Sequence, residues 1–165
     1  FELTYEGYGP FGVAILINCL TDNKNRTSSD VRAVLTKNNG SMGNPGSVNY
    51  LFDRKAIFQF DTYDDELIEF GISNNCLEIQ ESKNSLTFEY DPKDFKDVYE
   101  LFNSSAYTPS SAEIAYIPSS SINLKADQFD KITQLIEALE ELDDVQDVYA
   151  NFDIEEKELE SFLSE

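Results

Sequence analysis

The chain has 165 residues, a formal net charge of −20, 41% apolar residues and no histidine. This length suits one domain or two small ones with a hydrophobic core. A surface this acidic repels phosphate backbones, and the lack of histidine excludes Ser-His and Cys-His catalysis and histidine-ligated metal sites. We therefore expect a protein that is not an enzyme, with no catalytic residues, no cofactor and no metal.

The charge is divided unevenly along the chain. Residues 1–55 hold six basic and five acidic side chains, a net of +1, whereas residues 56–165 hold six basic and 27 acidic side chains, a net of −21. The sequence starts at Phe1 without an initiator Met, so we expect a fragment whose N-terminal part is missing. Its two cysteines form no CxxC pair and predict reduced, buried thiols. No run is long enough to predict a membrane span.

The first third predicts a strand, a helix and a second strand. A continuous apolar run at 13–17 predicts a central strand buried on both faces. Thr27 is a good N-cap for a helix over about 28–38. A glycine-rich loop at 40–46 then leads into a strand predicted over 48–52. Together these elements predict a βαβ unit.

The rest of the chain alternates strands and helices. Residues 56–118 follow the order βαββαβ, which is typical of a ferredoxin-like domain. A long amphipathic helix at 127–142 and a strand at 145–152 follow. We predict an α+β fold of two ferredoxin-like α/β domains, one inserted into the other. The split domain is 1–55 plus 119–152, the inserted domain is 56–118, and 153–165 form an acidic tail.

Short motifs spread along the chain resemble those of one known family. They are EGYGP at 6–10, TDN at 21–23, NRT at 25–27, VR at 31–32, GSV at 46–48, FDRK at 52–55, IP at 117–118 and LDDVQDVY at 142–149. Over about residues 5–154 the chain resembles the YebC/PmpR family, whose members are named as bacterial transcriptional regulators and mitochondrial translational activators. It departs from the family at Phe11, where a small residue is usual, and residues 56–112 match only loosely.

The resemblance implies a three-domain protein whose first domain, a small basic helical bundle, is absent here. It implies a non-enzymatic regulator of gene expression that binds DNA as a transcriptional regulator. The alternative within the family is a translation factor that acts at the ribosome. The expected partners are DNA, or the ribosome and its RNA, contacted mainly through the missing domain, with a protein partner on the acidic surface. The expected location is the cytoplasm, or alternatively the mitochondrial matrix, with no membrane contact.

Positive charge gathers only in the first third of the chain. Two interpretations stay open for these side chains: contact with the phosphates of nucleic acid, or a solvated face that nearby carboxylates partly neutralise. The candidate nucleic-acid-binding residues are Lys24, Arg26, Arg32, Lys37, Arg54 and Lys55.

Three other features have a structural and a functional interpretation. The glycine loops at 7–10 and 40–46 predict turns rather than phosphate cradles, since both lead into strands. The acidic residues at 140–144 predict a solvated helix end rather than a cation site. The aromatics of 50–60 predict core packing rather than a platform for RNA bases. An acidic ligand-binding domain, a small enzyme and a pure protein-interaction module are the competing classes.

Overall fold

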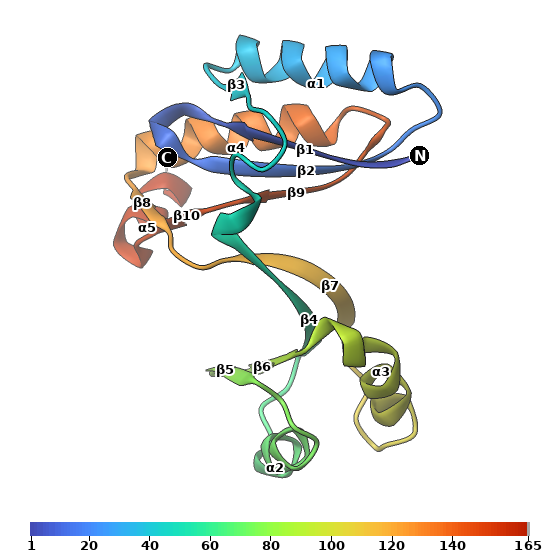
Figure 1. Cartoon of the computed structure of the whole chain (residues 1–165). Helices are drawn as coiled ribbons and strands as arrows, with labels where there is room; N and C mark the ends of the chain where they lie inside the picture. Colours follow the sequence, from blue (N-terminus) through green and yellow to red (C-terminus); the bar gives the residue numbers. More distant parts are fainter. Residues whose placement is uncertain (165) are drawn as a thin grey trace. The chain divides into compact units, whose positions relative to one another are not determined.

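The computed structural model describes residues 1–164 and has a mixed α+β fold, as predicted. The chain divides into two compact units, the first made of Phe1–Asp53 and Pro118–Glu165 and the second of Arg54–Ile117 (Figure 1). Each unit has its own hydrophobic core. None of the helices in the described part of the chain has the length and apolar character that a membrane span requires.

The first unit is built on a four-stranded sheet with the order β3-β1-β2-β9, whose neighbouring strands are all antiparallel. The unit also contains the helices α1 and α4 and the shorter helix α5 (Figure 1). The strands β8 and β10 form a separate, parallel pair. The bounds are β1 Glu2–Tyr8, β2 Ala14–Leu20, α1 Lys24–Lys37, β3 Ser41–Met42, β8 Ile122–Leu124, α4 Ala126–Glu140, β9 Val145–Ala150, β10 Phe152–Ile154 and α5 Glu156–Leu163.

The strand β2 is buried on both faces, which confirms the prediction from its apolar run. One face carries Ile15, Ile17 and Cys19, which pack against apolar residues of α1 and α4. Because side chains alternate along a strand, Ala14 and Leu16 lie on the opposite face, and both are fully buried there as well. A strand of this kind needs cover on each side of its sheet.

The second face of β2 lies beside a buried carboxylate. Glu6 of β1 is the direct neighbour of Leu16 and is only 6% exposed. Its carboxylate accepts hydrogen bonds from the backbone N–H groups of Gly46 at 2.6 Å, Val48 at 3.0 Å and Asn49 at 2.7 Å. These bonds tie the loop after β3 to β1 and place Val48 in a fully buried position. Gly46 has a φ of 90°, a conformation that favours glycine.

The predicted βαβ unit is wrong. The strand beside β2 is β1, which sequence reasoning missed, and the two run antiparallel. The predicted strand at 48–52 is instead a short 3-10 turn, Asn49–Leu51, followed by β4, Phe52–Phe60. The turn leaves Tyr50 71% exposed and Phe52 buried. The backbone N–H groups of Val48 and Asn49, which lie in the predicted strand, donate to Glu6 instead of to a neighbouring strand.

One smaller correction concerns the start of α1, and a further observation concerns the acidic tail. The helix α1 starts at Lys24, with Asn23 as its N-cap, so Thr27 lies inside the first turn rather than before it. The acidic tail contains α5, and Glu158 of that helix accepts a hydrogen bond from the backbone N–H of Ala126 at 2.9 Å. This carboxylate thus binds a free donor at the N-terminus of α4, where negative charge is favoured. Phe129 and Phe162 also pack edge to face, with ring centroids 5.1 Å apart.

The second unit is a four-stranded sheet with the order β5-β6-β4-β7. That order and the sequence of elements are those of a ferredoxin-like domain, as predicted. The strand β6 pairs antiparallel with both β4 and β5. The bounds are β4 Phe52–Phe60, α2 Asp65–Ser73, β5 Glu78–Ser82, β6 Ser85–Tyr90, α3 Phe95–Asn103 and β7 Ser111–Pro118.

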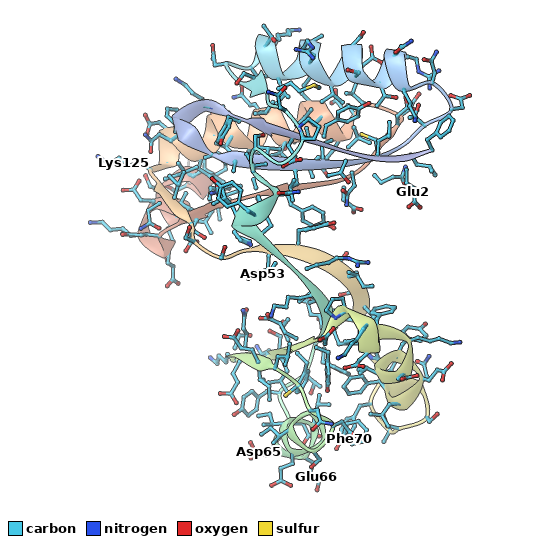
Figure 2. The ribbon with its side chains drawn as sticks, viewed as in Figure 1. Glu2, Asp53, Asp65, Glu66, Phe70 and Lys125 are labelled. Carbon is cyan, nitrogen blue, oxygen red and sulfur yellow. The ribbon has the colours of Figure 1, made fainter. Side chains whose placement is uncertain are left out.

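Aromatic rings fill the core of the second unit. Phe102 of α3 lies at its centre, 5.0 Å from Phe60 and 5.5 Å from Phe70, measured between ring centroids. Figure 2 shows Asp65 and Glu66 on the outer side of α2, away from this core. Gly71 permits close packing of α2, because a Cβ there would lie 2.2 Å from a ring carbon of Phe88. The buried aromatics of β4 are therefore packed inside the protein, as predicted, and offer no open stacking face, whereas the prediction of core packing is wrong for the exposed Tyr50.

We expect Glu6→Gln to lower the free energy of unfolding by about 2 kcal/mol, because the variant loses charge-assisted hydrogen bonds in a buried place. Urea unfolding measures the loss. Glu2→Gln is the matched control, since Glu2 is exposed on the same strand and its change should stay within about 0.5 kcal/mol. Equal stabilities of the two variants would contradict the role given to Glu6.

The stabilisation by Glu6 also depends on pH. Burial raises the pKa of this carboxyl, but the three backbone hydrogen bonds outweigh burial and hold its pKa below the ordinary value. A carboxyl with a lowered pKa stabilises the fold at neutral pH, and that contribution is lost as the pH falls through the folded-state pKa. The stability difference between the wild-type chain and Glu6→Gln should therefore shrink in acid.

Candidate functional site

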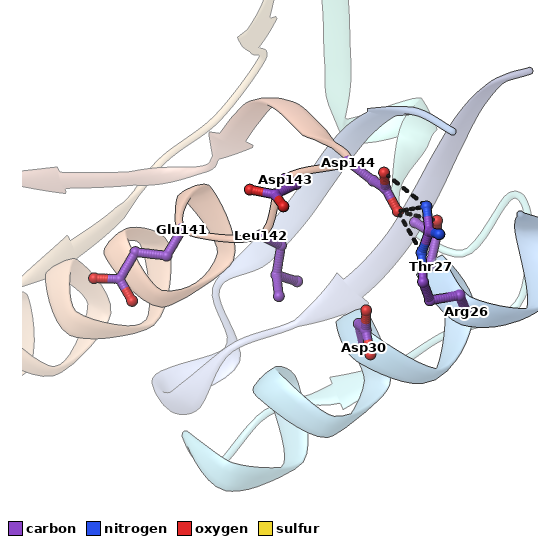
Figure 3. A pocket seen from close by; sticks show the side chains of 7 residues that line it. All are labelled: Arg26, Thr27, Asp30, Glu141, Leu142, Asp143 and Asp144. Atoms are coloured by element: carbon purple, nitrogen blue, oxygen red, sulfur yellow. Dashed lines mark hydrogen bonds and ion pairs between the residues drawn. The ribbon is translucent and has the colours of Figure 1, made fainter. Parts of the chain in front are cut away.

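The strongest polar cluster of the first unit joins the start of α1 to the turn between α4 and β9. Arg26 donates from Nη2 to Asp144 Oδ2 at 3.0 Å and to Asp22 Oδ1 at 3.0 Å. Its Nε lies 3.3 Å from Asp144 Oδ2. Thr27 Oγ1 donates to the same Oδ2 at 2.8 Å. Figure 3 shows the side chains of Arg26 and Thr27 meeting that of Asp144.

Local backbone structure fixes the cluster in place. The side chain of Asn23 accepts from the N–H of Arg26 at 3.1 Å and so starts α1 directly after β2. Thr21 lies at the end of β2, and its Oγ1 is 2.7 Å from Thr27 Oγ1. The carbonyl of Asp144 accepts from the N–H of Leu20 at 2.8 Å, which positions the turn before β9 beside β2. Arg26 and Asp144, which are 118 positions apart in the chain, are therefore held together by main-chain hydrogen bonding as well as by their charges.

Electrostatics agree with this geometry. The hydrogen bonds from Thr27 and Arg26 hold the pKa of Asp144 below its ordinary value, although partial burial opposes them. The side chain of Asp144 is 19% exposed and that of Arg26 is 47% exposed. The guanidinium is thus reachable from solvent but is already bound to two carboxylates.

A surface cavity of about 420 Å³ opens beside the cluster. Figure 3 shows its lining from α1 on one side and from the turn after α4 on the other. The lining carries four carboxylates and one guanidinium, so it favours neither a phosphate nor any other anion. Its residues are Arg26, Thr27, Asp30, Glu141, Leu142, Asp143 and Asp144. Within residues 1–164, no group of His, Cys, Asp and Glu side chains is arranged to hold a metal ion.

Four of the six candidate basic residues lie on α1 in the first unit. Lys24 opens α1, and its Nζ lies 4.4 Å from the ring centroid of Phe1. Arg32 and Lys37 are exposed farther along the same helix. Arg26 is held by Asp144 and Asp22.

Two of the six, Arg54 and Lys55, belong to the second compact unit. Arg54 is exposed on β4, and Lys55 is half-buried there. Burial and Glu78 raise the pKa of Glu89, and the charge of Lys55 opposes that rise. Lys55 therefore acts on a carboxylate of its own unit.

Sequence reasoning missed Asp144 as the shared partner of Arg26 and Thr27. The acidic residues at 140–144 were expected to form a solvated helix end, whereas Asp144 is half-buried and hydrogen-bonded. A signal was present, because NRT at 25–27 and LDDV at 142–145 are both motifs of the resemblance. Because the two motifs are far apart in the sequence, no local pattern indicated that they form one cluster.

Comparison with known proteins identifies the family. The family model described as "TACO1/YebC second and third domain" matches residues 1–152, so the chain belongs to this family and the resemblance is confirmed. A protein of Borreliella afzelii is 47% identical over 160 residues, which are 95% of this chain and 65% of that protein. A protein of Geotalea uraniireducens is 40% identical over 98% of this chain and 66% of its own length. Both are named "probable transcriptional regulatory protein".

A solved structure supports the same conclusion about the fold. The crystal structure of a conserved hypothetical protein from Aquifex aeolicus superposes with a TM-score of 0.85 at 37% identity. The match covers 94% of this chain and 66% of the Aquifex chain. This chain therefore spans about two thirds of the length of its relatives, and their names place the family in the regulation of transcription.

We expect Thr27→Val and Arg26→Gln each to raise the pKa of Asp144 toward its ordinary value, because the hydrogen bond from Thr27 and the hydrogen bond and charge of Arg26 lower this pKa. NMR titration of the Asp144 carboxyl carbon measures both shifts. Arg32→Gln is the matched control, an exposed arginine of the same helix that should leave the titration unchanged. A wild-type Asp144 that titrates like a free aspartate would show that the cluster does not form in solution.

Proposed function

We propose that this chain is the second-and-third-domain part of a non-enzymatic regulator of gene expression that acts by binding DNA. The observation that carries the proposal is the family match over residues 1–152, together with relatives named as transcriptional regulators. The absence of histidine and a cluster that binds its own arginine with its own carboxylates support a role without catalysis. A location in the bacterial cytoplasm fits the bacterial origin of these relatives.

Within such a protein, we assign most of the DNA affinity to a first domain, outside the part that this chain represents. The net charge of −20 repels DNA, and Arg26 already binds two carboxylates. Arg32 and Lys37 are exposed cations of α1 that can add weak phosphate contacts. The chain then serves as a scaffold that holds an acidic, protein-contacting surface.

The same acidic surface favours a second candidate function, that of a translation factor at the ribosome. A chain with 32 acidic and 12 basic side chains is better suited to contact basic proteins than a bare phosphate backbone. In this case ribosomes, rather than promoter DNA, would be recovered with a full-length relative. Sedimentation of the Borreliella afzelii relative with ribosomes tests this alternative directly.

The proposal predicts that the 165-residue chain binds DNA at least about 100-fold more weakly than a full-length relative, because it lacks most of the phosphate contacts. Fluorescence anisotropy with duplex DNA at several salt concentrations gives both the affinity and the number of contacts from the salt slope. Arg32→Glu with Lys37→Glu should weaken the residual binding. Lys83→Glu, an exposed lysine of the second unit, is the control. Equal affinity of the chain and the full-length relative would overturn the assignment to a first domain.

A further inference from the structure

The second unit contains a buried carboxylate, Glu89, on the side of its sheet that faces away from the core. Glu89 belongs to β6 and is only 5% exposed. The core residues of the same strand are Leu86, Phe88 and Tyr90. Because side chains alternate along a strand, Glu89 lies on the other face of the sheet. A carboxylate buried in this way needs strong partners if it is to stay ionised without a large cost.

The hydrogen bonding of Glu89 is weaker than that of the buried carboxylate of the first unit. Glu89 Oε2 accepts from Gln80 Nε2 at 3.3 Å, which is a long bond from a neutral amide. Glu6, by comparison, accepts three backbone hydrogen bonds of 2.6, 3.0 and 2.7 Å. The negative charge of Glu89 is therefore poorly compensated where it lies.

The neighbouring edge strand brings a like charge to Glu89. The strands β5 and β6 are antiparallel, and Glu78 of β5 is the direct partner of Glu89. Directly opposite side chains share a face with their Cβ atoms about 5 Å apart, and like charges placed there destabilise the pairing. In the described chain β5 ends its sheet, with β6 as its one neighbour. Repulsion between the two carboxylates thus acts on a strand that is held from one side.

The strand on the other side of β6 supplies a partly compensating charge. Ile57 of β4 is paired with Glu89, so Lys55, two residues earlier on β4, lies on the same face of the sheet. The strand β7 lies beyond β4, and Glu113 is its acidic residue. One lysine and one glutamate therefore flank Glu89 on the two adjacent strands.

The net electrostatic effect favours a proton on Glu89. Burial is the largest cause that raises the pKa of this carboxyl, and Glu78 adds to the rise, whereas Lys55 and the bond from Gln80 oppose it without cancelling it. A group whose pKa is raised in the fold contributes stability in acid, and this contribution is lost as the pH rises through the folded-state pKa. The dependence is opposite in sign to that of Glu6.

We propose that Glu89 is a proton-operated switch that controls how firmly the edge strand β5 is bound to β6. When Glu89 takes up a proton from solvent, its repulsion of Glu78 ends, and its new O–H group becomes a donor beside that carboxylate. When the proton leaves, the two charges push β5 away from the sheet. The loosened strand uncovers the core beside Ile79, which packs against it. This switch is independent of the proposed function, because it involves no nucleic acid.

Hydrogen exchange of the 165-residue chain, followed by NMR and corrected for the intrinsic pH dependence of exchange, measures the opening of β5. Protection of the β5 amides should be about threefold higher in mild acid than above neutral pH, because one like-charge pair is relieved. The N–H of Leu77, which donates to the carbonyl of Glu89 at 2.7 Å, reports on the start of the strand. Amides of β2 in the first unit are the reference and should not gain protection in acid.

Two variants separate the switch from general effects of charge. Glu89→Gln removes the charge and should keep β5 at its high protection at every pH. Glu78→Gln should raise the protection above neutral pH, because it removes the repelling charge from an exposed position. Glu81→Gln is the matched control, an exposed carboxylate of β5 that is paired with Leu86 and lies on the other face, and it should behave like wild type.

Three results would overturn the switch. They are a wild-type β5 whose protection does not change with pH, a pH dependence that persists in Glu89→Gln, and an equal effect of Glu81→Gln and Glu78→Gln. A ¹³C NMR titration of the Glu89 carboxyl must also show a charge change at the pH where β5 loosens, and a mismatch would exclude Glu89 as the cause. Thermal unfolding checks that Glu89→Gln is folded, and Glu78→Gln keeps the test decisive if it is not.

Discussion

The fold of the first unit depends on the need to cover both faces of β2. Helices α1 and α4 cover one face with apolar side chains. The other face buries Leu16 beside Glu6, and a carboxylate can be buried there only because three backbone N–H groups bind it. The glycine-rich loop and the residues after it thus have a structural role, because their backbone N–H groups bind the Glu6 side chain. Its role explains why glycines and a short turn stand where the apolar pattern alone predicted a strand.

The same strand also positions the polar cluster. Because β2 ends at Leu20 and β9 starts at Val145, the residues that follow β2 and precede β9 must lie side by side. Arg26 and Asp144 meet for this reason, and their ion pair occupies the guanidinium that would be the most obvious phosphate contact. A basic residue in a family motif can therefore have a structural task.

The sequence was informative where one local signal dominated. The apolar run of β2, the amphipathic stripe of α4 and the βαββαβ order of the second unit all predicted what the structure contains. Prediction from the sequence failed where tertiary contacts, rather than local patterns, determine the secondary structure. The strand β1 alternates only weakly, and the turn at 49–51 exists because Glu6 binds its N–H groups. Phe11 has a φ of 65°, a conformation that a bulky side chain rarely adopts, and no local pattern in the sequence indicated it. Pairing of Arg26 with Asp144 spans 118 positions, which no local pattern records.

The insertion of one unit into the other sets an order of folding. Residue pairs such as Ile15 with Ala150 join β2 to β9 across the whole of Arg54–Ile117. Contacts within the inserted unit close much shorter loops, and closing long loops is what slows folding. On a ribosome, β2 emerges long before β9 exists, and its apolar edge stays unpaired during that time. The inserted unit should therefore fold first and bring the two halves of the split sheet close together, so that it assists the assembly of the first unit.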